Sequence, residues 1–489
     1  MSQRRGLPVL AEELASHPFR PSYSTNVTAG LVGMAEFAVV AVVGVILHML
    51  QFGQGLLLPL PYSAVVLGAA AALVAAAKVT GGYDLASLRT PALTLLRTLA
   101  IWTMIVFACV VAMFLAKVTQ DVSRVWLTSW YLVTILGLLL VRMAVFFPVR
   151  ALMSAGRFDR RTALVGGGPS AEALVRALDA DEHREVQIVG IFDDRDESRS
   201  PDMVGGYPKL GTTDDLIEFV RRTHLDLVIF TLPITAEERI LQMLRKLWVL
   251  PVDIRLAAHQ SKLRLRPRSY SFIGSVPVLP VSDRPIADWD VVIKWLFDKI
   301  VGSILLLLLS PVMLAVALAV KLDSKGPVFF KQKRYGFNND VVEVYKFRSM
   351  YSDQLDPHAR RLVTKNDPRV TRVGRIIRKT SLDELPQLLN VVFKGNLSLV
   401  GPRPHAVNAG AMDRRYDDII DGYFARHRVK PGITGWAQIR GWRGETDTLE
   451  KIQRRVEHDL YYIENWSVLF DLYILLATPF ALLKTENAY

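Results

Sequence analysis

The sequence predicts an α/β membrane protein with a bundle of four transmembrane helices, a Rossmann-like cytoplasmic domain and a C-terminal domain anchored by a re-entrant membrane helix. Three observations indicate this fold class. Four long apolar segments come first, a glycine-rich turn follows between a strand pattern and a helix pattern, and a fifth apolar run contains Ser310-Pro311 near its middle. The 489 residues suffice for several domains, and a hydrophobic content of 51%, bunched in these runs, is typical of membrane proteins.

The four apolar segments are each close to the ~20 residues that cross a bilayer core. They lie at residues 30–50, 62–79, 98–118 and 126–147. The connection at residues 51–61 has no charge, whereas Arg142, Arg150 and Arg157 accompany the end of the fourth segment. The positive-inside rule therefore places the N-terminus and everything after residue 148 in the cytoplasm. We expect a mobile cytoplasmic arm at residues 1–28, without a cleaved signal peptide, and four transmembrane helices within residues 29–150. A buried helical bundle in a soluble protein is the alternative.

The net charge of +12 indicates anionic partners. In a membrane protein such an excess usually lies on cytoplasmic flanks, near anionic lipid headgroups, and we also expect an anionic substrate. The sequence shows no helix-turn-helix, zinc-finger or RNA-binding signature, so nucleic acid is not an expected partner. Cys109 is the only cysteine, which excludes an internal disulfide and a cysteine metal site.

A small doubly wound domain is expected at residues 151–265. An apolar strand at residues 161–165 leads into Gly166-Gly167-Gly168-Pro169-Ser170-Ala171, which matches the dinucleotide fingerprint G-x-G-x-x-A. A second strand ends at Asp193 and Asp194, where a ribose-binding acid is expected. Pro169 removes a backbone donor from the phosphate-binding turn. Bound NAD and a purely structural or regulatory domain therefore both stay open.

The fifth apolar run, at residues 300–320, follows a linker predicted at residues 266–290. Basic residues flank both of its ends, which argues against a straight crossing of the membrane. Ser310 and Pro311 interrupt its middle, and a proline there breaks a helical hydrogen bond. We predict a helix, a break at these two residues and a second helix, re-entering the same leaflet over residues 293–321. The alternative is a kinked spanning helix.

Two adjacent carboxylates, Asp383 and Glu384, stand out in the C-terminal domain at residues 291–489. They follow Arg378 and Lys379 and precede Pro386, so we expect them in or beside the first turn of a helix. An ionised aspartate can attack phosphorus as a nucleophile and can hold Mg²⁺. Alternatively, Ser381-x-x-Glu384 matches a capping box, which carries no chemistry.

Cations recur beside glycine, proline and aromatic residues throughout this domain, which is typical of phosphate-binding turns. Our candidates for substrate binding are Arg334, Lys346, Arg348, Arg378, Arg403 and Lys430.

The C-terminal third resembles the bacterial sugar transferases, the monotopic polyprenyl-phosphate phosphoglycosyl transferases. The motifs that carry the resemblance lie at residues 326–336, 346–350, 378–390, 401–404 and 430–438. The whole layout resembles the large members that initiate exopolysaccharide synthesis. Residues 441–448 and the terminal Asn487-Ala488-Tyr489 look like the undecaprenyl-phosphate glucose phosphotransferases.

The resemblance implies a two-step reaction at the cytoplasmic face of the bacterial inner membrane. Asp383 matches the family nucleophile, which attacks the sugar-bearing phosphorus of UDP-glucose and releases UMP; undecaprenyl phosphate then takes the phosphosugar. Glu384 matches the dyad partner, with its role left open. The implied cofactor is Mg²⁺, and Asp383 matches a position associated with it. UDP-galactose or a UDP-N-acetylated sugar stays open as the donor, and so does a homodimer.

Two functions from other classes are alternatives. A membrane-anchored NAD-dependent nucleotide-sugar dehydratase or epimerase needs a catalytic Tyr-x-x-x-Lys, and residues 161–260 contain none. A transporter or scaffold would need charged residues inside the membrane spans. Glu36, His48 and Lys117 are sparse and mostly near the ends of the spans, which is a poor basis for a transport path.

Overall fold

The computed structural model describes residues 7–16, 22–53, 55–180, 186–195, 201–233, 236–258, 271–273, 276–352, 367–404, 410–411, 414–415, 423–442 and 448–483. These residues form two compact units. One lies within residues 20–160, and the other combines an N-terminal helix with the chain from residue 161 onward. Residues 443–447 and 487–489, part of the predicted subtype resemblance, lie outside the described residues.

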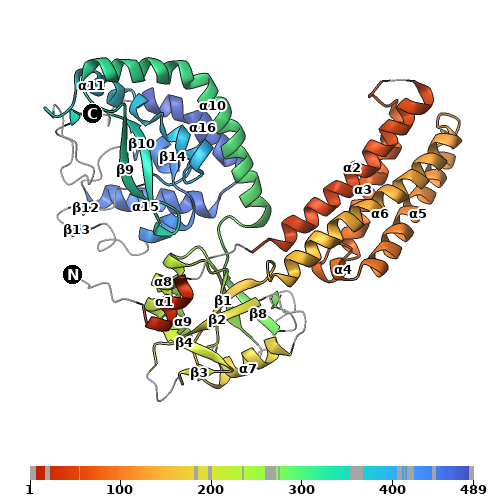
Figure 1. Cartoon of the computed structure of the whole chain (residues 1–489), viewed down its shortest axis with the longest axis horizontal. Coiled ribbons are helices and arrows are strands. Elements are labelled where there is room, and N and C mark those ends of the chain that lie inside the picture. The colour runs from red at the N-terminus through yellow and green to blue at the C-terminus, as the bar shows by residue number, and fades with distance from the viewer. Residues whose placement is uncertain are drawn as a thin grey trace. The chain divides into compact units, whose positions relative to one another are not determined.

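The first unit consists mainly of apolar helices (Figure 1). They are α2 (Thr25–Phe52), α3 (Leu60–Val79), the short α4 (Leu85–Arg89), α5 (Pro91–Leu115) and α6 (Arg124–Ser154). Helix α2 packs against α3 and α6, and α5 also packs against both of these helices. The four long helices are each long and apolar enough to cross a membrane. Trp102, Trp126 and Trp130 are fully buried among them, so large aromatic rings fill the centre of this unit.

A buried ion pair lies between α2 and α6. Arg142 Nε lies 2.5 Å from Glu36 Oε1, and the Tyr83 hydroxyl donates to Glu36 Oε2 at 2.6 Å. Pairing is the usual way to place charged side chains in an apolar setting. Arg142 is therefore an interior residue of this unit, and its predicted place in the basic flank after the fourth apolar segment is wrong.

The Rossmann-like domain contains one eight-stranded sheet in the order β3-β4-β2-β1-β5-β6-β8-β7. Its strands are β1 (Arg160–Val165), β2 (Val186–Phe192), β3 (Met203–Val204), β4 (Tyr207–Gly211), β5 (Leu227–Phe230), β6 (Asp253–Ala257), β7 (Ser271–Ile273) and β8 (Val276–Ser282). Its helices are α7 (Pro169–Asp179), α8 (Thr213–Arg222) and α9 (Glu237–Leu247). The central pairs are parallel, and β7 and β8 add antiparallel pairs at one edge.

Two predicted segments belong to this domain instead. Strands β7 and β8, within the predicted linker, belong to the sheet because β8 pairs with both β6 and β7. Within the predicted mobile arm, α1 (Val9–Ser16) packs on the domain. Leu7 and Ala11 are buried in its core, and Glu12 pairs with Arg222 at 3.1 Å. Leu14 and Ala15 also pack against this core, but the helix has only eight residues, too few for a clear periodic pattern in the sequence.

Side chains of the same domain bind the backbone of the glycine-rich turn. Pro169 begins α7, where its missing N–H is not needed. The buried Asp193 accepts a hydrogen bond from Gly167 N at 2.7 Å, and Arg195 NH2 donates both to Asp193 and to the Gly167 carbonyl. Burial alone would raise the pKa of Asp193, but these hydrogen bonds lower it to about 2. Asp193, one of the two acids at the predicted ribose position, is therefore engaged by the turn itself, and the other, Asp194, accepts a hydrogen bond from Thr213 N at 2.7 Å.

The C-terminal domain is built around α10 (Asp288–Asp323), a 36-residue helix. The chain stays helical through Ser310 and Pro311, so the predicted interruption of the helix is wrong. Figure 1 nevertheless shows α10 as two arms that meet at a bend. Val301 and Leu305 of the first arm and Val316 and Val320 of the second pack into hydrophobic clusters of this same domain.

The domain also contains further strands and helices. Among them are the hairpin of β9 (Phe329–Tyr335) and β10 (Val341–Phe347), the parallel pair β11 (Ser398–Val400) and β14 (Gly432–Thr434), and the helices α11 (Arg372–Lys379), α12 (Gln387–Leu389), α14 (Trp436–Ile439), α15 (Leu449–Glu464) and α16 (Val468–Leu483). Strands β10 and β11 and helices α11, α12 and α16 contact α10. A 3₁₀ helix, η6 (Tyr423–Arg428), packs on α15.

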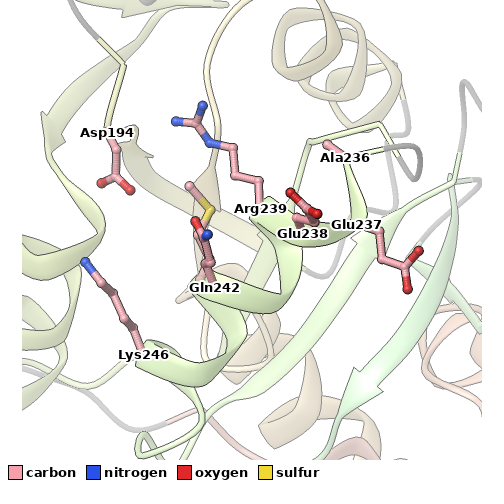
Figure 2. Close-up of a pocket in the computed structure, with 8 residues that line it drawn as sticks. Asp194, Ala236, Glu237, Glu238, Arg239, Gln242 and Lys246 are labelled. Atoms are coloured by element: carbon pink, nitrogen blue, oxygen red, sulfur yellow. The ribbon is translucent and has the colours of Figure 1, made fainter.

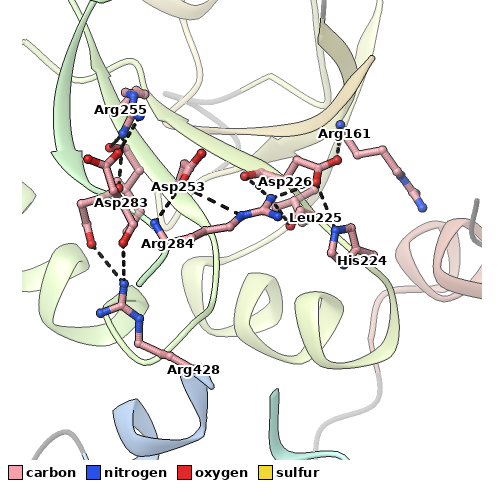
Figure 3. A network of polar contacts seen from close by, with 11 residues as sticks. Arg161, His224, Leu225, Asp226, Asp253, Arg255, Asp283, Arg284 and Arg428 are labelled. Atoms are coloured by element: carbon pink, nitrogen blue, oxygen red, sulfur yellow. Dashed lines mark hydrogen bonds and ion pairs between the residues drawn. The ribbon is translucent and has the colours of Figure 1, made fainter. Parts of the chain in front are cut away.

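The Rossmann-like and C-terminal domains contact each other within the second unit. Arg428 of η6 donates to the Asp283 carbonyl at 2.8 Å, beside a network in which Arg284 binds Asp226 (Figure 3). Arg221 of α8 also lies over the ring of Phe424, 5.1 Å from its centroid. Helix η6 is thus a shared element of the interface between the two domains.

Candidate functional site

Asp383 and Glu384 lie on a tight turn between helices. Helix α11 ends at Lys379, Ser381 adopts a positive φ of 59°, and a 3₁₀ turn, η4 (Leu382–Glu384), follows. Leu382 and Leu385 pack beside Met313 and Val320 of α10, so the turn is held against the second arm of that helix. The carboxylates are therefore not in the first turn of an α-helix. The capping box also fails, because the left-handed backbone of Ser381 is not the extended conformation that such a cap needs.

The Glu384 carboxylate is held by two cations. Lys346 Nζ of β10 lies 2.8 Å from Glu384 Oε1, and Arg403 NH1 donates to Oε2 at 2.9 Å. Arg403 NH2 also donates to Oε1, which makes the pair bidentate. Burial would raise the pKa of Glu384, but Arg403 and Lys346 hold it well below its ordinary value. Glu384 is thus an ionised carboxylate, and both of its oxygens already accept hydrogen bonds from Lys346 or Arg403.

Asp383 differs from its neighbour. Its half-buried carboxylate makes no hydrogen bond or ion pair with any residue that the structure describes. Burial raises the pKa of Asp383, the charge of Glu384 raises it further, and Lys346, Arg378 and Arg403 act in the opposite direction. Two adjacent carboxylates with opposite pKa shifts have different chemical roles open to them. Asp383 is the one whose oxygens are available to a ligand.

Two further cations complete the site. Arg334 of β9 donates to Gln332 at 2.7 Å and to the Pro404 carbonyl. Burial and the nearby Arg403 lower its pKa to about 10. Arg378 lies in the last turn of α11, within electrostatic range of Asp383. The residues that the structure brings together are Asp383, Glu384, Arg334, Lys346, Arg378 and Arg403.

Two predicted substrate-binding residues lie elsewhere. The buried guanidinium of Arg348 donates to the carbonyls of Val320, Ser324 and Lys325 at the end of α10. These are carbonyls at a helix C-terminus, which have no partner within the helix. The Arg348 guanidinium is therefore occupied by the protein backbone and not assigned to the substrate. Lys430 Nζ donates to the Gly395 carbonyl at 2.7 Å, and burial lowers its pKa. The structure gives Lys430 no contact with the carboxylate pair.

The structure adds residues that sequence reasoning did not select. Asn390 is fully buried and bonds to the backbone of Glu343 and Tyr345, which fixes the helix after Asp383 to the strand that carries Lys346. Asn390 is the last residue of the predicted motif at residues 378–390, and this position in the motif could have indicated its importance. Arg426 donates to the Arg403 carbonyl at 2.8 Å, and no motif indicated that contact.

The fit of the site to Mg²⁺ rests on Asp383. Among the described residues there is no group of three His, Cys, Asp or Glu side chains that could hold a metal ion. Mg²⁺ often keeps several waters and takes one or two carboxylates together with substrate phosphates. The unpartnered Asp383 carboxylate fits an ion that is bound together with the substrate.

A pocket in the Rossmann-like domain is separate from this site. It has a volume of about 680 Å³ and lies at the start of α9 (Figure 2). Asp194, Glu237, Glu238, Arg239 and Lys246 give it side chains of both charges. Its lining includes none of the six residues that surround the carboxylate pair, so it is not the place where their chemistry occurs.

Comparison with known proteins supports the predicted family. A sequence model of the bacterial sugar transferase family matches residues 289–485, and one for a CoA-binding domain matches residues 78–258. The chain is 38% identical over 368 residues to the UDP-glucose:undecaprenyl-phosphate glucose-1-phosphate transferase of Escherichia coli (strain K12), which covers 75% of this chain and 76% of that protein.

Other relatives extend the similarity. The protein of the same name from Xanthomonas campestris pv. campestris is 36% identical over 377 residues, or 77% of each chain. The undecaprenyl-phosphate galactose phosphotransferase of Salmonella typhimurium is 30% identical over 410 residues, or 79% of this chain and 81% of that protein. The resemblance predicted from the motifs is confirmed, and this chain belongs to the bacterial sugar transferase family.

Proposed function

We propose that this protein transfers glucose 1-phosphate from UDP-glucose to undecaprenyl phosphate, giving undecaprenyl-diphospho-glucose and UMP, as the first membrane step of exopolysaccharide or capsule synthesis. Two relatives whose alignments cover 75% and 77% of this chain are named for the transfer of glucose 1-phosphate from UDP-glucose. The relative named for galactose is less similar, at 30% identity, so UDP-galactose is the second candidate donor. We do not favour the dehydratase alternative, because Asp193 and Asp194, at the position expected for a ribose-binding acid, both accept hydrogen bonds within their own domain.

The observation that carries the mechanism is the contrast between the two carboxylates. Lys346 and Arg403 occupy the oxygens of Glu384, whereas those of Asp383 have no partner among the described residues. We therefore assign the nucleophile to Asp383. Its oxygen bonds to the sugar-bearing phosphorus, the bond from that phosphorus to the bridging oxygen breaks, and the electron pair leaves with UMP. The lipid phosphate then attacks the same phosphorus and frees Asp383.

The surrounding cations have an electrostatic role in this reaction. Phosphoryl transfer depends mainly on positioning and charge neutralisation. Arg334, Arg378 and Arg403 bring guanidinium groups to the site, and guanidinium matches phosphate geometry. Mg²⁺ bound with the substrate would neutralise diphosphate charge, with Asp383 as its ligand from the protein. Glu384, held by two cations, fixes the positions of Lys346 and Arg403 beside the reacting phosphate.

The bend of α10 supports a re-entrant anchor. A straight helix of 36 residues would be about 54 Å long, enough to separate its ends across a bilayer. Instead, both arms pack on the same domain, through residues such as Val301 and Val320. A re-entrant helix returns the chain to the face that it came from, so that Asp383 reaches both a cytosolic nucleotide sugar and a lipid phosphate. A reporter enzyme fused after Tyr489 tests this arrangement, and a periplasmic reporter would exclude it.

The activity itself is tested by UMP release. Membranes containing the intact protein, Mg²⁺, undecaprenyl phosphate and UDP-glucose should release UMP in a lipid-dependent manner. Asp383→Asn should lower the rate by at least ~10³-fold, as expected for loss of a nucleophile. Asp214→Asn, an exposed carboxylate in the Rossmann-like domain, is the matched control and should leave the rate unchanged. UMP release from UDP-galactose alone would retain the mechanism and change the donor.

A further inference from the structure

A buried arginine on α15 has donors that no described residue satisfies. Arg455 is 3% exposed, and its Nε and NH2 atoms have no hydrogen-bond partner in the part of the chain that the structure describes. Its neighbour in sequence, Arg454, is exposed and pairs with Glu457 at 3.2 Å. The two adjacent arginines therefore lie in opposite environments, one in solvent and one in the interior.

The interior around Arg455 carries more positive than negative charge. Arg426 donates to the Arg403 carbonyl at 2.8 Å and lies 2.6 Å from the Asp459 carboxylate. The side chains of Arg426 and Asp459 are both almost fully buried. The Asp459 carboxylate pairs with Arg426, and its charge also acts on Arg455, so two buried arginines share one carboxylate. Burial and the charges of Arg426 and Arg403 lower the pKa of Arg455 to about 10, although the charge of Asp459 acts in the opposite direction.

A buried guanidinium that shares its carboxylate counter-charge with another arginine, and whose donors no described residue satisfies, needs an explanation. Removing a charge from water is costly unless a partner and hydrogen bonds compensate for it. Such a residue destabilises the ligand-free protein. It is typical of a binding site in which the ligand supplies the missing hydrogen-bond acceptors. The missing partner must be an anion, and the planar donors of guanidinium suit phosphate oxygens.

We propose that Arg455 is a phosphate-binding residue of the transfer site. The inference rests on the proposed function and adds a subsite to it. Arg455 lies within electrostatic range of Arg403, whose guanidinium binds Glu384 next to Asp383. An in-line displacement at phosphorus needs charge stabilisation on the side of the leaving phosphate as well as on that of the nucleophile. The ligand is a phosphate group, which either the nucleotide or the lipid brings.

The test compares Arg455→Met and Arg455→Lys with Arg454→Met as the matched surface control. UMP binding is measured by calorimetry on the purified full-length protein, together with KM for UDP-glucose and for undecaprenyl phosphate and with the Tm of the ligand-free protein. A hydrogen bond to a charged group is worth about 1.5–3 kcal/mol, so Arg455→Met should weaken UMP binding by about 10- to 100-fold. Arg455→Lys should recover part of this loss, and Arg454→Met should bind UMP normally.

The Tm distinguishes a binding role from a structural role. If Arg455 awaits a ligand, Arg455→Met keeps or raises the Tm of the ligand-free protein, because a buried charge with unsatisfied donors is removed. A rise in KM for undecaprenyl phosphate with unchanged UMP binding would support the subsite and assign it to the lipid phosphate. Unchanged UMP binding and unchanged KM values, with a lowered Tm, would overturn the inference.

Failure of the inference can be told apart from failure of the proposed function. UMP binding does not require turnover, so it is measurable even if the intact protein releases no UMP from UDP-glucose. An active protein whose Arg455 variants bind UMP and both substrates normally would retain the function and reject the subsite. An inactive protein whose UMP affinity still depends on Arg455 would retain the subsite and reject the function.

Discussion

Lys346 Nζ lies 2.8 Å from Oε1 of Glu384, and this ion pair joins the β9–β10 hairpin to the turn that carries Asp383. The side chains of both residues are largely buried, at 15% and 13% exposure. Removing Glu384 from such a setting would leave the buried Lys346 without its hydrogen-bonded counter-charge, which is costly. The pair therefore links the fold of the domain to the charge of the site.

Glu384→Gln should impair stability as well as activity. The change leaves Lys346 and Arg403 without a counter-charge, and we expect a loss of about 3 kcal/mol in the free energy of unfolding. UMP release should fall with it, because both cations lose their fixed positions. Thermal unfolding in detergent and the UMP assay measure the two effects. Glu343→Gln, on the exposed face of β10, is the control and should change neither.

The rate of UMP release should have an acid limb set by Asp383. The nucleophile must be ionised, and burial together with Glu384 raises its pKa above the ordinary 3.8. The rate should therefore fall, as pH decreases, at a higher pH than an exposed aspartate would give. In Glu384→Gln the neighbouring charge is gone and the cations remain, so the residual activity should have its acid limb at lower pH. A limb that does not move would show that another group controls it.

Arg348→Ala should act on stability rather than on substrate binding. The guanidinium donates to carbonyls at the end of α10, and their loss leaves buried acceptors unsatisfied. We expect a loss of about 2–4 kcal/mol in the free energy of unfolding and an unchanged KM for UDP-glucose in the folded fraction. Arg375→Ala, an exposed cation on α11, controls for the loss of surface charge. A selective rise in KM with normal stability would restore Arg348 to the substrate site.

The features that the sequence predicted correctly are those that depend on residues close together in the chain. The apolar segments reappear as long apolar helices because about 20 apolar residues are a long and periodic signal. The motif around Asp383 and Glu384 lies at the centre of the cation cluster. Of the cations chosen for their turns, Arg334, Lys346, Arg378 and Arg403 gather there.

What the patterns missed depends on tertiary contacts. A capping box and a tight turn share the letters Ser381-x-x-Glu384, and only the positive φ of Ser381 separates them. Arg348 lies in the same motif as Lys346, but its guanidinium binds the Ser324 carbonyl because α10 ends beside it. Asp193 looked available for a ribose until the fold placed Gly167 and Arg195 against it. Each of these outcomes depends on groups that are distant in sequence.

The most direct test of the mechanism is to look for the phosphosugar on Asp383. The purified protein is incubated with Mg²⁺ and UDP-glucose labelled in the sugar, without undecaprenyl phosphate, and its peptides are analysed by mass spectrometry. We predict label on the peptide that contains Asp383, formed in step with UMP, removed on addition of undecaprenyl phosphate and absent in Asp383→Asn. UMP that forms only when the lipid is present, with no labelled peptide at any time, would contradict a covalent intermediate and indicate direct transfer between the substrates.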